Sequence, residues 1–539
     1  MCAVKNKMIL KKINKRQSLR AVGDHSVSIT KNISRALFTV MWLMLATITG
    51  CKSESKSRIV AGGNDGGTGG GTSGLIWTPN QYAPYEDYYD QCAAPRSGID
   101  PSTGKPYYDR PGSAAHEKFA LRSYSHEMYL WANELTDIDP TTSLNPLEYF
   151  EYLKTSTDRF HFYQKSSDYY QDFILGKSLS YGITWEQLSN GDIVVVYVER
   201  NSPAQLAGVV RGDRLVKVDG VSAATLIQTN NKQFNEALFP SEGTATTHQF
   251  VFKNHAGVEQ PQQRLTAVEL TIDTVQNLQF FTGTHEQKIA YFSFSSFNGT
   301  AENELVDVVK QIKTAQAQEL IIDLRYNGGG FLDVASELAY MVAGDGPTNN
   351  RIFTAFRVGP NNTDERFLNR TTEFYNQTKA EQPLPALNLK RLYVLTGGGT
   401  CSASESLING LRGVDFPVIQ IGEPTCGKPY GFFGFSNCGY EYFTISFQGA
   451  NAKGFSRFED GFAPNNSEQA QGSPLGCTLY DSLAKPLGDT QEALLAAAVQ
   501  HIETGTCPSG GSLAAPRGVK NTLLHSSPLF SNSIAPRGK

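Results

Sequence analysis

The hydrophobic positions of the chain change their period along the sequence, and each change predicts a different kind of structure. Apolar residues follow helical spacing over residues 119–135, and again after Asn145-Pro146, where proline suits a first helical turn. Short alternating strands, such as residues 193–198, follow between about residues 172 and 275. From Lys288 onward, apolar strands alternate with amphipathic helices. The pattern predicts a helical unit, a β-rich domain and an α/β core.

The expected elements of the core can be given by residue number. We expect strands at residues 289–294, 320–324, 392–395 and 418–421, and helices at 301–317, 331–343 and 403–411. The polar stretch 344–388 interrupts this alternation and predicts a lid or excursion outside the central sheet. Residues 75–112, rich in Tyr, Pro and Gly, predict an irregular surface segment.

The first fifty residues differ from the rest in charge, with nine Lys or Arg and one acidic residue. Their apolar run, residues 36–48, is shorter than the ~20 residues that a membrane-spanning helix needs, so it predicts the hydrophobic part of a signal peptide. The run ends in Ile48-Thr49-Gly50-Cys51, which resembles the bacterial lipobox, in which the cysteine receives a lipid. The alternative is an ordinary leader with a chance cysteine. The Gly-rich residues 52–74 then predict a flexible tether.

Composition narrows the class of protein. The 539 residues are 40% hydrophobic and 19% charged, which is typical of a multi-domain globular protein. Beyond residue 50 there are 39 basic against 51 acidic residues, so we do not expect nucleic acid as a partner. Export leaves six cysteines for disulfides, with their pairing open. They are Cys92, Cys401, Cys426, Cys438, Cys477 and Cys507. No Cys or His spacing is typical of zinc, so we expect neither a metal nor a cofactor.

Two segments of the β-rich region resemble a PDZ domain. They are Ser180-Tyr-Gly-Ile183 and the more specific Asn201-Ser-Pro-Ala-Gln-Leu-Ala-Gly-Val-Val-Arg-Gly-Asp-Arg-Leu215. In that family a glycine-containing loop turns its N–H groups toward the C-terminal carboxylate of a peptide, which adds to the sheet edge. The resemblance assigns this role to Tyr181, Gly182 and Ile183. The alternative is a purely structural β-domain.

Three segments of the α/β core carry candidate chemistry: Leu320-Ile-Ile-Asp-Leu-Arg-Tyr-Asn-Gly-Gly-Gly330, Thr400-Cys-Ser-Ala-Ser-Glu405 and Gly422-Glu-Pro-Thr-Cys-Gly-Lys428. Each also has an ordinary interpretation. The glycines suit a strand-to-helix turn, Ser402 with Glu405 suits a capping box, and a lysine after a glycine is usually solvated. Together, in this order and behind a PDZ-like domain, they resemble the C-terminal processing (tail-specific) peptidases, serine endopeptidases with a Ser/Lys dyad. The resemblance extends over residues 113–501.

The resemblance implies a role for each motif. Ser402 would be the nucleophile and Lys428 the general base, while the N–H of Ala403 and of a glycine, Gly328, Gly329 or Gly330, would bind the oxyanion. A lysine base must lose about 3 pKa units through burial, and the aromatic residues after it are candidates for that environment. They are Tyr430, Phe432 and Phe433. The implied fold of the core is a ClpP/crotonase-like sandwich.

Some positions depart from the family pattern. Many members carry a glutamine four residues after the lysine, where this chain has Phe432. Cys401 and Cys426 lie beside the two catalytic positions, and we expect a disulfide between them; the alternative is that Cys401 is itself the nucleophile. His161 is one position out of step with a histidine segment of related enzymes, and we expect a structural histidine.

The sequence therefore predicts a multi-domain protein. Its expected parts are a lipoprotein signal peptide (1–50), a lipid anchor and tether (51–112), a helical N-terminal unit (113–171), a PDZ-like domain (172–275), a serine peptidase core (276–505) and a C-terminal tail (506–539). We expect cleavage of proteins or peptides with free C-termini, and lipid anchoring in the bacterial envelope at the outer membrane, with any adaptor unidentified. The alternatives are an inactive scaffold that binds C-termini, and an envelope protein kept for assembly with partners.

Overall fold

The computed structural model describes residues 75–241, 243–465, 472–508 and 522–524. The expected signal peptide, Cys51 and the Gly-rich tether lie outside these residues. No helix in the described part combines the length and apolar character needed to span a membrane. The six cysteines beyond Cys51 form three disulfides, Cys92–Cys438, Cys401–Cys426 and Cys477–Cys507.

The N-terminal unit is built on two helices. Its elements are η1 (Tyr85–Asp87), β1 (Gln91–Cys92), β2 (Ile99–Asp100), β3 (Lys105–Pro106), β4 (Arg110–Pro111), α1 (Ala114–Met128), η2 (Ala132–Glu134), α2 (Pro146–Glu151), β5 (Phe162–Lys165), α3 (Ser166–Asp168) and η3 (Tyr169–Ile174). Asn145 caps α2 in a capping box with Glu148. Folded structure begins before the expected boundary at residue 113, because Tyr85, Tyr88 and Tyr89 bury their rings against the cluster around α1 instead of remaining in water.

The β-rich domain forms one sheet in the strand order β12-β11-β9-β8-β7-β26, with β10 paired to β9. Its elements are β6 (Lys177–Ser180), β7 (Ile183–Gln187), β8 (Ile193–Val198), α4 (Pro203–Leu206), β9 (Arg214–Val218), β10 (Val221–Ser222), α5 (Ala223–Thr229), α6 (Asn231–Leu238), β11 (Thr247–Lys253), β12 (Gln263–Thr266) and β13 (Val268–Thr271). β6 and β13 pair with each other where the domain begins and ends. The last strand of the sheet, β26 (Thr522–Leu524), comes from the expected C-terminal tail.

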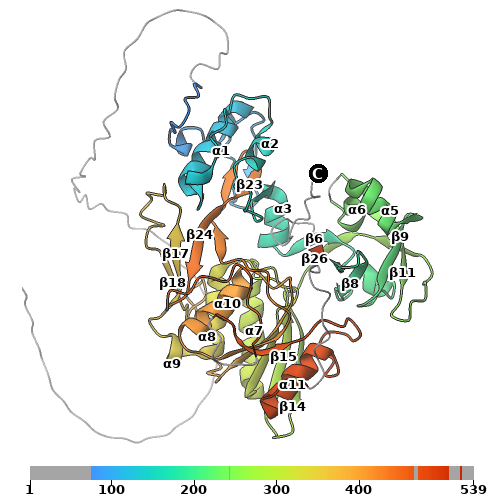
Figure 1. The fold of residues 1–539 in the computed structure, drawn as a ribbon. Helices are drawn as coiled ribbons and strands as arrows, with labels where there is room; N and C mark the ends of the chain where they lie inside the picture. The colour runs from blue at the N-terminus through green and yellow to red at the C-terminus, as the bar shows by residue number, and fades with distance from the viewer. Residues whose placement is uncertain (1–74, 242, 466–471, 509–521, 525–539) are drawn as a thin grey trace, which may run out of the picture. The chain divides into compact units, whose positions relative to one another are not determined.

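The core contains a six-stranded sheet in the order β14-β15-β16-β19-β20-β25 (Figure 1). Its elements are β14 (Val275–Thr282), β15 (Lys288–Phe294), α7 (Ala301–Ala315), β16 (Glu319–Asp323), α8 (Leu332–Ala343), β19 (Leu392–Thr396), α10 (Ala403–Gly413), β20 (Val418–Gly422), β25 (Leu475–Thr478) and α11 (Ala493–Thr504). β14 is antiparallel to β15, and the other neighbours are parallel. Alternate strand residues pack against α7, α8 and α10 on one face and against α11 on the other. The expected α/β sandwich is confirmed.

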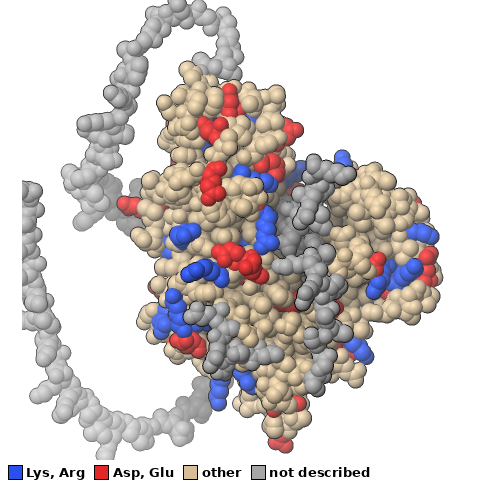
Figure 2. All heavy atoms as spheres, viewed as in Figure 1, with Lys and Arg blue, Asp and Glu red and all other residues tan. Residues whose placement is uncertain are grey.

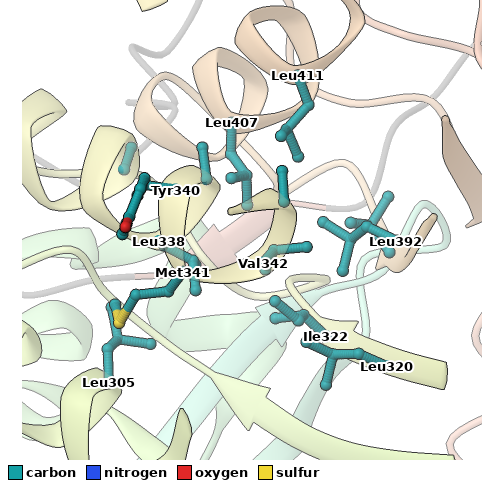
Figure 3. Close-up of a cluster of buried hydrophobic side chains, with 14 of the residues drawn as sticks. Leu305, Leu320, Ile322, Leu338, Tyr340, Met341, Val342, Leu392, Leu407 and Leu411 are labelled. Atoms are coloured by element: carbon teal, nitrogen blue, oxygen red, sulfur yellow. The ribbon is translucent and has the colours of Figure 1, made fainter. Parts of the chain in front are cut away.

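The larger hydrophobic cluster lies between the sheet and α8 and α10 (Figure 3). Leu320 and Ile322 of β16 and Leu392 of β19 meet Met341 of α8 and Leu407 of α10, and all five side chains are fully buried. This packing fixes where β19 ends and α10 begins, which is where Ser402 lies.

A second sheet, in the order β18-β17-β24-β21, lies outside the central one. Its strands are β17 (Ile352–Val358), β18 (Thr371–Glu373), β21 (Tyr430–Phe432) and β24 (Ile445–Ala450), and α9 (Asp345–Thr348) precedes them. The polar stretch 344–388 therefore supplies two strands of this sheet. β22 (Phe435–Asn437) and β23 (Tyr440–Phe443) join β5 of the N-terminal unit in a third sheet.

One buried arginine links the β-rich domain to the core. Arg211 donates hydrogen bonds to the carbonyl of Val196, to the hydroxyl of Tyr326 and to the carboxylate of Asp481. Tyr326 directly precedes Asn327 and the run of glycines, so this contact reaches the candidate site.

On the face of the molecule drawn in Figure 2, acidic and basic side chains are interspersed and form no broad basic surface.

Candidate active site

Three neighbouring parallel strands bring the three core motifs together. The glycine loop follows β16, Ser402 follows β19, and Lys428 follows β20. These strands are adjacent in the sheet, in the order β16-β19-β20. The carboxyl ends of parallel strands meet at the same sheet edge, which is where open α/β sheets place their sites. The fold thus assembles residues that lie up to about a hundred positions apart in the sequence.

Ser402 lies at the start of α10 with a strained backbone. Its φ of 55° and ψ of −111° are rare for a residue with a side chain, and such a conformation costs on the order of 1–3 kcal/mol. Gly329 lies directly against it, since a Cβ on Gly329 would come within 2.8 Å of the Ser402 Cβ. Only a glycine allows this approach. Helix position alone does not predict this strain, because an ordinary N-cap residue has an extended backbone.

The Glu405 carboxylate connects the serine to the lysine. Its Oε2 accepts hydrogen bonds from the N–H of Ser402 at 3.0 Å and from the N–H of Lys428 at 2.8 Å. Its Oε1 accepts from the hydroxyl of Thr425 at 2.6 Å and from the N–H of Gly427 at 2.8 Å. Sequence reasoning recognised Glu405 only as a helix-capping residue. The structure makes it a buried positioning residue that holds two loops together.

We expect Glu405→Gln to reduce activity and to shift its pH dependence. The amide offers one acceptor oxygen, so two buried N–H or O–H groups lose their partner, at about 1–3 kcal/mol each in stability. The negative charge of Glu405 also raises the pKa of Lys428, so its removal should move the acid limb of the rate profile to lower pH. Unfolding in denaturant and the pH dependence of kcat/KM measure the two effects.

Glu441→Gln is the matched control for this variant. Glu441 is also a buried carboxylate, bonded to Ser166 and Ser436, but it lies in β23. The Glu441→Gln substitution should lower the free energy of unfolding and leave the pH dependence of kcat/KM unchanged. An equal pH shift in both variants would contradict a specific role for Glu405.

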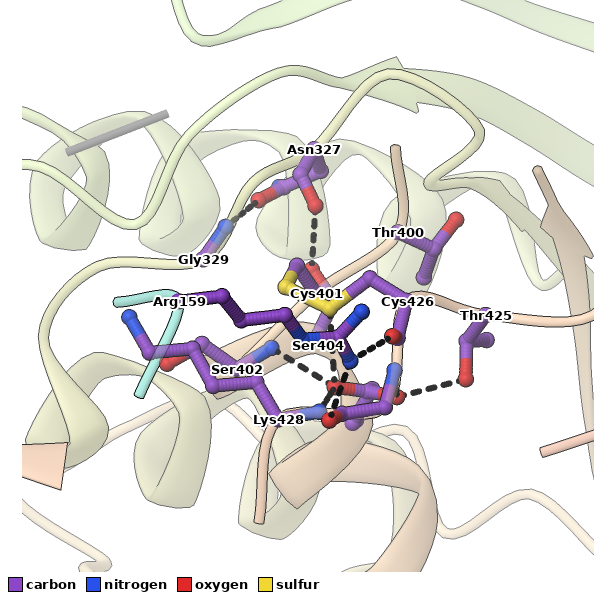
Figure 4. The surroundings of a disulfide bond; sticks show 12 residues. Arg159, Asn327, Gly329, Thr400, Cys401, Ser402, Ser404, Thr425, Cys426 and Lys428 are labelled. Atoms are coloured by element: carbon purple, nitrogen blue, oxygen red, sulfur yellow. Dashed lines mark hydrogen bonds between the residues drawn. A yellow bond between two sulfur atoms is a disulfide. The ribbon is translucent and has the colours of Figure 1, made fainter. Parts of the chain in front are cut away.

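A disulfide joins the residue before Ser402 to the loop that carries Lys428. Cys401 and Cys426 are bonded, with their Cα atoms 5.2 Å apart (Figure 4). The structure thus contains the expected bridge, and in it Cys401 has no free thiol to act as a nucleophile. In the part of the chain that the structure describes, the one cluster with metal-ligand proximity is Cys401, Glu405 and Cys426, and its two sulfurs are bonded to each other.

Lys428 is buried in an aromatic environment. The residue is 7% exposed, and its Nζ lies 4.1 Å from the ring centroid of Phe432 and 5.0 Å from that of Phe160. Burial lowers the pKa of Lys428 to about 7, while the carboxylates of Asp158 and Glu405 act in the opposite direction. Phe432, at the position where the resemblance led us to expect a glutamine, therefore contributes to the apolar surroundings that a neutral lysine needs.

A segment of the N-terminal unit completes the surroundings of the lysine. Arg159 donates hydrogen bonds from Nη2 to the carbonyls of Cys426, at 2.9 Å, and Gly427, at 3.2 Å. The buried Asp158 accepts a hydrogen bond from the Tyr129 hydroxyl and a second from the N–H of Phe160. Sequence reasoning missed these residues, because they lie more than 260 positions from the lysine loop.

His161 has a structural environment in the same segment. Its Nε2 lies 2.9 Å from the carbonyl oxygen of Phe150, and its ring stacks on that of Phe150. Burial lowers the pKa of His161 to about 3, so the imidazole is neutral at physiological pH.

The expected oxyanion donors differ in their availability. The N–H of Gly329 donates to the Asn327 side chain at 2.9 Å, so in this structure it is not free for a substrate. Among the described residues, no acceptor is present for the N–H groups of Ala403 or Gly328. Asn327 was not predicted from the sequence; its carbonyl also accepts from the N–H of Cys401 and the hydroxyl of Ser404, which ties the glycine loop to the serine turn.

The expected peptide-binding loop lies at the start of β7. Gly182 has a φ of 80° and packs against Ser202, and its N–H donates to the hydroxyl of Ser180 at 2.9 Å. Tyr181 is buried in the domain core, and Ile183 begins the strand. A cavity of about 220 Å³ opens beside Gly182 and Ile183.

Comparisons with known proteins match two regions of the chain to families. Residues 288–432 match peptidase family S41, and residues 194–231 match the PDZ domain. The chain is 28% identical over 227 residues to the carboxyl-terminal-processing protease of Synechocystis sp., covering 42% of this chain and 47% of that protein. It is 26% identical over 239 residues to the carboxy-terminal processing protease CtpA of Bacillus subtilis, covering 44% and 45%. The alignments thus span about half the length of these relatives.

A solved structure supports the fold. A crystal structure from the S41 family, of a Bacteroides fragilis protein, superposes with a TM-score of 0.55 at 21% identity. The match covers 72% of this chain and 97% of that one. At this identity the similarity is one of fold.

Proposed function

We propose that this chain is a serine endopeptidase of the C-terminal processing type, because residues 288–432 match peptidase family S41 and residues 194–231, which precede them, match the PDZ domain. Ser402 acts as nucleophile and Lys428 as general base. The observation that carries the proposal is the environment of Lys428. This lysine is buried and its pKa is about 7. Its backbone N–H donates to the same oxygen of Glu405 that accepts from the backbone N–H of Ser402. A pKa near the working pH is what a general base requires.

In the proposed reaction the Ser402 Oγ attacks the scissile carbonyl carbon while Lys428 Nζ takes the hydroxyl proton. The resulting oxyanion accepts a hydrogen bond from the N–H of Ala403, and a glycine N–H of the loop supplies a second. When the C–N bond breaks, the lysine returns the proton to the leaving amine. Water then hydrolyses the acyl-serine ester by the same route and regenerates Ser402.

In this proposal the PDZ domain captures the substrate, and the N-terminal leader determines where in the cell the protein is held. The substrates are proteins or peptides with free C-termini that add to the β7 edge, and the apolar cavity beside Ile183 suits an apolar terminal residue. The Ile48–Cys51 motif supports a lipid anchor in the bacterial envelope, and Lys52 after the cysteine favours the outer membrane. Substrates among envelope proteins follow from this proposed location.

The proposed capture predicts a preference between two forms of one substrate. An unfolded protein with a free apolar C-terminus should be cleaved with a kcat/KM about tenfold or more above the same protein with a C-terminal amide, because the amide removes the charge that the loop binds. Gel-based initial rates measure this. The same assays with Ser402→Ala control for contaminating peptidases. Equal rates for the two substrates would contradict C-terminal capture while leaving the peptidase assignment intact.

A further inference from the structure

The peptide-binding edge of the PDZ sheet is already paired with a strand of this same chain. β26 lies antiparallel to β7, with Leu523 opposite Glu186 and Leu524 opposite Trp185. It is the edge strand of the sheet. Addition of an extended segment to this edge is the way in which PDZ domains bind peptides.

The two leucines of this strand lie on opposite faces of the sheet, as the alternation of a strand requires, with Leu523 buried and Leu524 partly buried. Leu524 packs against the core of the PDZ domain, the cluster that contains Trp185. Leu523, which is 5% exposed, belongs to a separate cluster with Val194 and Val196 of β8. The strand is therefore held by side chains as well as by backbone pairing.

Leu523 also contacts the loops of the candidate active site. Its Cδ1 lies 2.2 Å from the position that a Cβ on Gly399 would occupy, and Gly399 precedes Ser402 by three residues. Tyr326, next to Asn327 of the glycine loop, packs against the same cluster. The strand thus contacts the loop that leads to Ser402 and shares a hydrophobic cluster with Tyr326 of the glycine loop.

The cavity of about 220 Å³ lies next to β26, at the start of β7. Leu524 lines it together with Gly182, Ile183 and Phe239. β26 pairs with the part of β7 from Trp185 to Gln187, and the start of β7 borders the cavity. A peptide that pairs along the whole of β7 and reaches the glycine loop must displace β26.

We propose that Thr522–Leu524 is a built-in ligand of the PDZ edge that competes with incoming peptides. The favoured competitor is an extended segment with two adjacent large apolar residues, one for each face of the sheet. The proposal rests on the proposed function, since it takes peptide capture at β7 as the role of the domain. Displacement also removes Leu523 from the loops around Ser402.

The test measures occupancy and competition separately, on the purified chain carrying Ser402→Ala to prevent cleavage. Amide hydrogen exchange of residues 183–187 reports occupancy of the edge. Binding of a fluorescent peptide with the sequence of residues 518–524 and a free C-terminus reports competition. This chain is compared with two variants that lose the strand: the double variant Leu523→Glu/Leu524→Glu, and a chain that ends at Pro508 and so keeps the Cys477–Cys507 disulfide. The control is Leu206→Glu, at an exposed position of the PDZ domain.

We expect faster exchange of residues 183–187 and at least tenfold tighter peptide binding in the double variant and in the shortened chain, and neither change in Leu206→Glu. Unchanged exchange in both would overturn the occupancy. Faster exchange without tighter binding would overturn the competition and leave β26 as a structural strand. Because neither readout depends on cleavage, an inactive peptidase would refute the proposed function without affecting this result.

Discussion

Replacement of Ser402 by alanine should abolish labelling by an active-site serine probe and reduce peptide-bond cleavage by about 10³-fold or more, with the folded structure retained. The reaction needs an oxygen nucleophile at the strained turn, and alanine supplies none. The residues around the turn do not depend on the hydroxyl, because the bond to Glu405 comes from the backbone N–H of residue 402. Covalent labelling detected by mass spectrometry measures the first effect, and cleavage of an unfolded protein measures the second.

Ser406→Ala is a suitable control, since Ser406 lies one turn further along α10 and is half-buried. It should keep wild-type labelling and rate within a few-fold. If Ser402→Ala were labelled as strongly as the wild type, the nucleophile would be assigned wrongly. If neither protein were labelled while both were folded, the chain would bind peptides without cutting them.

The sequence predicted the parts of the site whose signals are local. Glycines after a strand, a serine before a helix and a lysine after a strand each form a short pattern, and the order of parallel strands brings them to one edge. The lowered pKa of Lys428 was also expected from its aromatic neighbours. Phe432 does lie over Nζ, whereas Phe433 packs against Phe367 and Phe447 instead.

The residues that sequence reasoning missed act through contacts between distant segments. Arg159 and Phe160 reach Lys428 from the N-terminal unit, and β26 reaches the PDZ edge from the tail. A three-residue strand carries too little pattern to be recognised, and nothing local marks an arginine that bonds carbonyls in another domain. The availability of the Gly329 N–H depended on the Asn327 side chain, which lies within the glycine motif but was given no role from the sequence.

Replacement of Lys428 by methionine should remove activity, by about 10³-fold or more, and at the same time stabilise the protein. The wild-type kcat/KM should fall as the pH drops through about 7, because protonation of Lys428 removes the base. Methionine has a similar length and no charge, so it fits the space near Phe432 but accepts no proton. Rates measured across this range on an unfolded substrate test the first expectation.

The gain in stability follows from the sign of the pKa shift. Burial lowers the pKa of Lys428 in the folded state from its ordinary value of 10.5 to about 7. Below about pH 7 both folded and unfolded chains carry the charge, and the folded state bears the full cost of burying it; above the unfolded value neither does. Methionine should thus raise the free energy of unfolding by on the order of 4 kcal/mol at neutral pH and below, and progressively less toward pH 10.

Denaturant unfolding at several pH values measures this gain, and Lys453→Met is the control. Lys453 is exposed and pairs with Asp415 at the surface, so its loss should change stability by less than about 1 kcal/mol. An inactive Lys428→Met that gains no stability, together with a wild-type rate that is flat between about pH 6 and 8, would mean that the lysine is charged in the folded protein. A charged lysine has no lone pair for the serine proton, and the base would then have to be sought elsewhere around Ser402.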